Sequence, residues 1–103
     1  MKASRRSVLE TDRALGHAAD LLLGMHRTIA GDSDRPLKKL KLEFALAQLR
    51  GLVTSDVWSP TLGAVLAGQG EQLVEGAGSE DVLIQAHDEL TQRRNAISAQ
   101  VLS

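Results

Sequence analysis

Apolar side chains and one threonine in the first third of the chain recur at alternating intervals of three and four residues, and this spacing constrains the fold most. The series consists of Val8, Thr11, Leu15, Ala18, Leu22, Met25 and Ile29. Heptad spacing places a continuous seam on one face of an α-helix and is typical of helices packed on helices. Leu21 and Leu23 widen the seam. We therefore predict a first helix from Ser4 or Ser7 to about Ala30 that contacts more than one neighbour.

A second helix is predicted between a break at residues 31–36 and about Val53. Pro36 suits the first helical turn, with Asp34 as the N-cap. This helix carries two apolar stripes, so it is expected to be central in the bundle or buried at an interface. One stripe consists of Leu37, Leu40 and Phe44, and the other of Leu42, Ala45, Leu46, Leu49, Leu52 and Val53.

The remainder of the chain predicts a short third helix and a long last one. Ser59-Pro60 pairs a cap with a proline in the first helical turn. Glycines interrupt the segment that follows, and each interior glycine costs about 1 kcal/mol relative to alanine. The third helix is therefore expected to be short or irregular, in one piece or two. Ser79 is predicted to cap the last helix, in which Glu89 and Arg93 are spaced to pair. The seam of the last helix consists of Leu83, Ala86, Leu90, Ile97 and Val101.

The composition indicates a core of aliphatic side chains. Hydrophobic residues make up 43% of the 103 positions, while Phe44 and Trp58 are the only aromatic residues. Leucine favours helices over sheets, and a chain of this length has room for one domain. We therefore predict an all-α fold, in which residues 1–103 form a single domain built as a small antiparallel bundle of about four helices.

The charge balance and the lack of cysteine argue against several classes of function. A net charge of −1 gives no overall basic excess for nucleic acid or an anionic membrane. Without cysteine there is no disulfide, thiol nucleophile or cysteine-based zinc site. No window approaches the roughly 20 apolar residues of a membrane span. We expect a soluble, cytoplasmic protein of bacterial source, and export without a leader is left open.

The sequence holds no recognisable catalytic, metal-binding or cofactor-binding constellation. A metal site inside a helical bundle needs converging carboxylates and histidines, often as Glu-x-x-His. That motif is absent, and no two of His17, His26 and His87 lie four positions apart. The glycines near the third helix lack the strand and the lysine of a phosphate-binding loop. We predict no enzyme activity, no metal and no cofactor.

The first hypothesis is a non-catalytic helical interaction module, such as an adaptor, small chaperone, regulator or assembly subunit. Such a module binds another protein, or a second copy of itself as a homo-oligomer, through surplus apolar surface. Tryptophan buries a large area with few rotamers and often anchors an interface. The predicted partner-binding residues are Trp58, Leu37, Leu40, Phe44, Leu62 and Leu66.

Two alternatives remain open. A small all-helical enzyme or ligand binder would draw a polar site from Arg13, Asp20, Glu43, Arg50 and Arg94. A nucleic-acid-associated regulator would use the basic patch Lys38, Lys39 and Lys41 together with Arg5 and Arg6. Such a run is usually the solvated face of an amphipathic helix, and no aromatic residues interleave it, so nucleic acid is not the expected partner.

Overall fold

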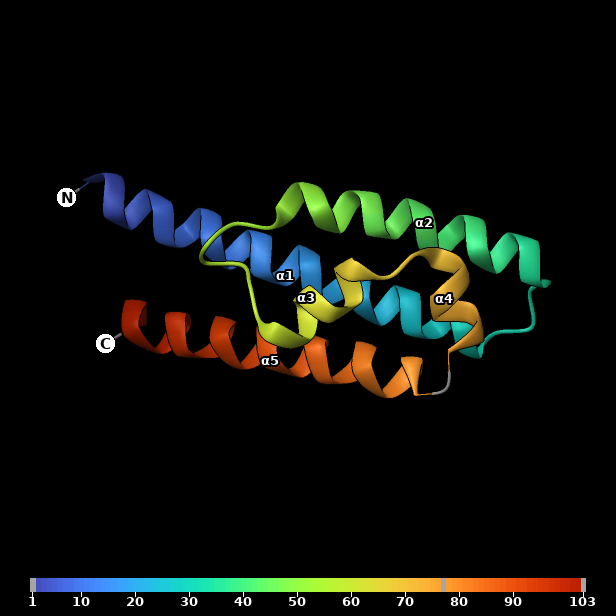
Figure 1. Cartoon of the computed structure of the whole chain (residues 1–103). Coiled ribbons are helices and arrows are strands. Elements are labelled where there is room, and N and C mark those ends of the chain that lie inside the picture. The colour runs from blue at the N-terminus through green and yellow to red at the C-terminus, as the bar shows by residue number, and fades with distance from the viewer. Residues whose placement is uncertain (1, 77, 103) are drawn as a thin grey trace.

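The computed structural model of the chain consists of α-helices and connecting loops (Figure 1). It describes the backbone of residues 2–76 and 78–102 and the side chains of residues 8–70, 72–76 and 78–100. Within these residues there are five helices and no strand, which confirms the predicted all-α bundle. The helices are α1 (Lys2–Ala30), α2 (Arg35–Leu52), α3 (Pro60–Ala67), α4 (Gly70–Glu75) and α5 (Ser79–Leu102).

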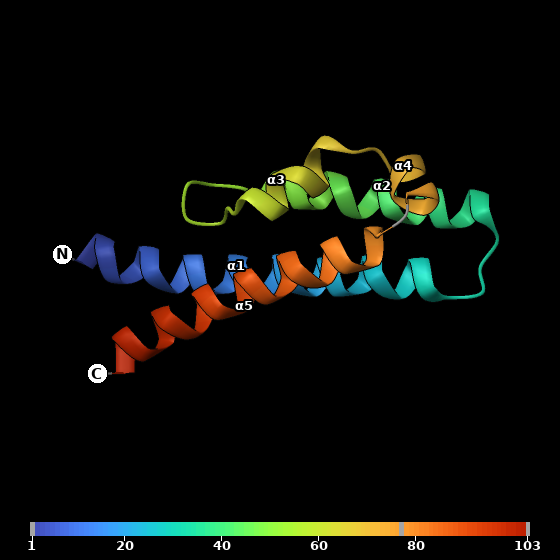
Figure 2. The same cartoon turned by 60° about the horizontal axis from the view of Figure 1, so that its bottom comes forward.

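The helices form two layers, which Figures 1 and 2 show from two directions. The long helices α1 and α5 lie side by side and antiparallel in one layer. The second layer contains α2, which runs antiparallel to α1, and the short helices α3 and α4, which lie between α2 and α5. Both ends of the chain lie at the same end of an elongated molecule of 49 × 21 × 20 Å.

The predicted seams of the long helices form the core. The four central seam residues of α1, from Leu15 to Met25, are at most 1% exposed. The α5 seam is equally buried from Leu83 to Leu90, and Ile97 is half-buried. The side chain of Val101 lies outside the described residues. Aliphatic residues from the α3 and α4 segments, such as Val65 and Leu73, complete the same cluster.

The predicted third helix is two short helices, α3 and α4. The hydroxyl of Ser59 accepts a hydrogen bond from the backbone N–H of Leu62 at 3.0 Å, so Ser59 caps α3 as predicted. The helix then stops at the glycine-rich link, and α4 begins at Gly70. A Cβ at Gly70 would lie 2.8 Å from the backbone oxygen of Lys39. Glycine at this position therefore allows α4 to pack directly on α2.

Three predicted caps differ from the structure. The first helix begins at Lys2, so Ser4 and Ser7 lie inside it. Asp34 occupies the N-cap position of α2 without a side-chain capping bond; Pro36, in the first turn, has no N–H to donate. Ser79 is the first residue of α5, and its hydroxyl donates to the carbonyl oxygen of Gly76 at 2.9 Å.

Candidate functional site

The helix α2 presents apolar side chains on two opposite faces. Its inner face packs into the core through Leu42, Leu46 and Leu49, which are at most 1% exposed. On the other face, Leu40 is 62% exposed and Phe44 is 70% exposed. Since apolar side chains usually gather on the buried side of a helix, the second row is surplus to the fold of one chain.

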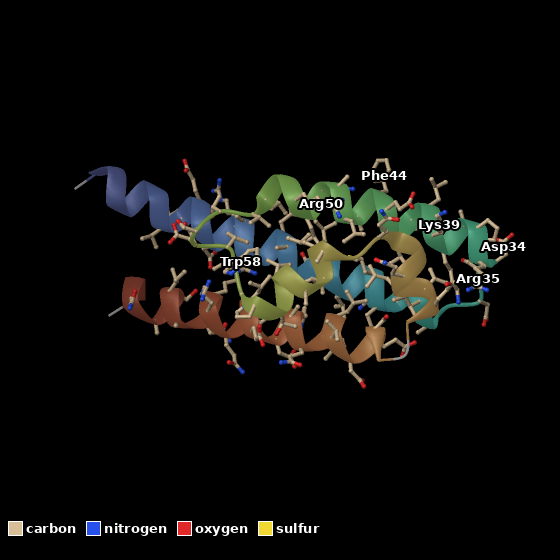
Figure 3. The ribbon with its side chains drawn as sticks, viewed as in Figure 1. Asp34, Arg35, Lys39, Phe44, Arg50 and Trp58 are labelled. Atoms are coloured by element: carbon tan, nitrogen blue, oxygen red, sulfur yellow. The ribbon has the colours of Figure 1, made fainter. Side chains whose placement is uncertain are left out.

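The exposed row extends along the whole helix. Positions 37, 40, 44, 47 and 51 repeat at intervals of three and four, which places them on one line of the helix surface. All five residues are exposed, and Figure 3 shows Phe44 projecting from α2 away from the other helices. This row is termed the outer stripe, and it consists of Leu37, Leu40, Phe44, Ala47 and Gly51.

Polar side chains border the outer stripe on both flanks. Glu43 and Arg50 lie on the flank towards α4. Lys41 and Gln48 lie on the opposite flank, on the side of Lys38, which bonds to the end of α1. The guanidinium of Arg50 also donates to the carbonyl oxygens of Leu66 at 3.0 Å and Gly68 at 3.3 Å, where α3 ends. An apolar row with a polar rim is the usual composition of a protein interface.

The structure separates the other predicted partner-binding residues from the outer stripe. Trp58 is 43% exposed but lies in the loop before α3, away from Phe44 (Figure 3). Its ring covers Gly63, where a Cβ would come within 2.7 Å of the indole. Leu62 is fully buried in the core and has no surface to offer a partner, and Leu66 is half-buried.

The predicted basic patch is not one surface. Lys38 is half-buried, and its ammonium group donates to the carbonyl oxygen of Ile29 at 2.9 Å, near the end of α1. Lys39 lines a groove between α2 and α4, whereas Lys41 is exposed on the other flank of α2. Successive helical positions point in different directions, which is why a run in the sequence does not form a patch. The side chains of Arg5 and Arg6 lie outside the described residues.

A carboxylate of α5 holds the start of α3, a contact that no pattern in the sequence predicted. Glu89 accepts hydrogen bonds from the hydroxyl of Thr61 at 2.8 Å and from the amide of Gln85 at 3.2 Å. The bond from Thr61 is the largest cause that lowers the pKa of Glu89, and Ser59, Gln85 and the charge of Arg93 lower it further. These favourable contacts outweigh the cost of burial, which acts in the opposite direction.

Arg93 does not form the predicted pair with Glu89 as its main contact. Its guanidinium donates to the carbonyl oxygen of Asp56 at 3.1 Å and to that of Trp58. Hydrogen bonds from Arg93 therefore hold the loop before α3 against α5. The hydrogen bond from Thr61 to Glu89 holds the first turn of α3 against the same helix. The sequence signal was limited to the spacing of the two charges, which could not indicate backbone acceptors in a distant loop.

A polar groove of about 440 Å³ lies between α1 and α5. Arg94 crosses it and donates to the carboxylate of Asp12 at 3.0 Å, a hydrogen bond that raises the pKa of Arg94. A Cβ at Gly16 would lie 2.6 Å from the guanidinium, so glycine makes room for the arginine. Asp20 lines the same groove, which therefore holds two of the predicted polar residues.

A smaller groove of about 240 Å³ between α2 and the α3–α4 link contains Glu43 and Arg50. Arg13, the remaining member of the predicted polar set, is exposed on α1. Within the described part of the chain, no group of three or more His, Asp or Glu residues is placed to hold a metal ion. Nor is any described helix long and apolar enough to cross a membrane.

The chain matches no known protein-family model, no curated protein and no solved structure. What it does must therefore be inferred from its own surface. On that surface, the outer stripe of α2 is a row of apolar side chains that the fold of a single chain does not use.

Proposed function

We propose that the protein is a non-catalytic helical interaction module, acting in the cytoplasm, that binds another polypeptide along the outer stripe. The observation that carries this proposal is the exposure of Leu40 and Phe44, at 62% and 70%, on the face of α2 opposite the core. Fully burying one such side chain contributes about 1.5–3 kcal/mol. Covering the row is therefore strongly favourable, and a second helix fits its heptad spacing.

Affinity capture from the source organism tests this function. The tagged chain is compared with a Leu40→Ser/Phe44→Ser variant, and a Gln92→Ser/Ala96→Ser variant on the exposed face of α5 serves as the matched control. We expect a protein that is retained by the native chain and by the control but is lost from the α2 variant. Identical sets of captured proteins for all three chains would contradict the proposal.

The groove between α1 and α5 supports a second candidate, the binding of a small zwitterionic ligand. It brings the cation of Arg94 near the carboxylate of Asp20, whose charge contributes to raising the pKa of Arg94. Titration calorimetry with free amino acids tests this candidate. A binding heat that disappears in Arg94→Gln is expected, and the lack of any heat with the native protein would remove the candidate.

A further inference from the structure

We propose that the outer stripe binds the outer stripe of a second copy of this chain, with the two α2 helices antiparallel across a two-fold axis. The inference rests on the proposed function, because it names the partner of the same surface. The order of side-chain sizes and charges along α2 favours this partner and this orientation.

Large and small residues are segregated along the outer stripe. Leu37, Leu40 and Phe44 occupy its first half, and Ala47 and Gly51 occupy its second half. In an antiparallel pair, the first half of one helix faces the second half of the other. Phe44 then lies against Ala47 of the second copy, and Leu40 against Gly51. A two-fold axis makes each of these contacts twice, as a closed dimer requires.

Gly51 has no role in the packing of a single chain. A Cβ built at this position meets no atom within 4 Å, and the residue lies in the last turns of a helix, where glycine is less favourable than alanine. Glycine is typical of positions where another group approaches the backbone closely. In the antiparallel arrangement, the side chain of Leu40 from the second copy is that group.

The same alignment pairs opposite charges beside the apolar seam. Glu43 lies next to Arg50 of the second copy, and Lys41 lies next to Gln48. Such flanking positions of a heptad set the partner and the orientation. Within one chain, a single nitrogen of Arg50 donates to the carbonyl oxygens of Leu66 and Gly68. A guanidinium has five N–H donors. The remaining N–H groups of Arg50 can therefore donate to the carboxylate of Glu43 from the second copy.

Other alignments of the same two stripes are less favourable. An antiparallel pair shifted by one heptad sets Leu40 against Phe44 and brings Glu43 close to Glu43 and Lys41 close to Lys41 of the second copy. A parallel pair sets Phe44 against Phe44 and leaves Gly51 facing Gly51. In both alignments, the large side chains of one copy no longer face the small residues of the other. The shifted antiparallel alignment also brings like charges together, which destabilises the contact.

The length of α2 limits the strength of the dimer. Its 18 residues span roughly 27 Å, which is between two and three heptads. The outer stripe alone is therefore smaller than the interfaces of permanent dimers. We expect reversible association that depends on chain concentration, in the micromolar range.

Disulfide trapping tests both the partner and the alignment. The chain has no cysteine, so an introduced thiol is the only one present. A Leu40→Cys chain is mixed with a Gly51→Cys chain of different tag length under mild oxidation. We expect the mixed dimer as the main cross-linked product. In a dimer of two Leu40→Cys chains, or of two Gly51→Cys chains, the two thiols would lie roughly 16 Å apart along the helices. This distance is beyond the reach of a disulfide.

The charges and the choice of surface provide two controls. Adding Glu43→Arg to both cysteine chains should lower the cross-linking yield several-fold at low salt, and high salt should restore much of it. A mixture of Gln92→Cys and Ala96→Cys, on the exposed face of α5, should give no mixed dimer. An unchanged yield with Glu43→Arg would overturn the alignment.

Other outcomes overturn the antiparallel alignment or the second copy as the partner. A cross-link of the Gly51→Cys chain to itself would show a parallel pair, and the absence of any cross-link would overturn the proposed antiparallel contact. Binding of the native chain to anionic vesicles, lost in Leu40→Ser/Phe44→Ser, would assign the outer stripe to a membrane surface instead. A further outcome is that the cysteine chains give no cross-link while affinity capture still retains a protein on the native chain and loses it in Leu40→Ser/Phe44→Ser. That combination would overturn the second copy as the partner and keep the proposed function.

Discussion

Glu89 connects α5 to the start of α3 through one carboxylate, which makes the attachment sensitive to pH. Its pKa in the folded chain is lowered from the ordinary value of 4.5, chiefly by the hydrogen bond from Thr61. A carboxyl group with a lowered pKa stabilises the fold above its unfolded pKa, and this contribution is lost as the pH falls through the folded pKa. We therefore expect Glu89→Gln to lower the free energy of unfolding by about 1 kcal/mol at neutral pH.

Urea unfolding at neutral pH and at acidic pH measures this effect. The difference in the free energy of unfolding between the native and Glu89→Gln chains should shrink once the pH lies below the folded pKa of Glu89. Asp32→Asn, in the exposed loop after α1, is the control and should match the native chain. A Glu89→Gln difference that stays constant with pH would show that the ionised carboxylate is not the stabilising group.

Arg93 determines how firmly the loop before α3 is held. Its guanidinium donates to the carbonyl oxygens of Asp56 and Trp58, and Trp58 is the only tryptophan in the chain. Replacing Arg93 by methionine removes these bonds while keeping a long side chain. We expect acrylamide to quench the tryptophan emission more strongly in Arg93→Met, and not in Gln92→Met. Equal quenching in all three chains would contradict this role.

At the scale of helices, two helical glycines, Gly51 and Gly70, have different surroundings. A Cβ at Gly70 would meet the backbone oxygen of Lys39 at 2.8 Å, whereas one at Gly51 would meet nothing. Overpacking against backbone costs about 1–3 kcal/mol, so Gly70→Ala should destabilise the fold. Gly51→Ala should stabilise the dilute monomer by up to about 1 kcal/mol, through helix propensity. Thermal melts of the two variants provide the comparison, and equal shifts would contradict the close packing of α4 on α2.

The sequence predicted the long helices well because their burial follows heptad spacing. The seam of α1 and the glycine-weakened third helix are both found in the structure. The caps at Ser4, Ser7 and Ser79 were wrong, because α1 begins at Lys2 and Ser79 is already the first residue of α5. A capping side chain contributes only about 1 kcal/mol, so it is a weak guide to where a helix begins. Helix existence is decided by many residues together, whereas the end of a helix depends on one or two.

At the scale of the whole molecule, sequence patterns identified both stripes of α2 but not which one faces the core. Both are apolar and helical in period, so only the positions of α1 and α4 could decide between them. Leu62 was misplaced for a similar reason, since an apolar residue in a short helix gives no indication of its exposure. The contact of Glu89 with Thr61 spans 28 positions in the sequence and involves common polar residues, so no local pattern could reveal it.

The mass of the protein in solution depends on whether the outer stripe is covered. Sedimentation equilibrium over a range of concentrations, for the native chain and Leu40→Ser/Phe44→Ser, is the most direct measurement. We predict that the native mass rises from 11.0 kDa towards twice that value as the concentration increases. The variant should remain at the mass of one chain throughout. A native chain that stays monomeric at every concentration would contradict the account of α2 as a surface shared between copies.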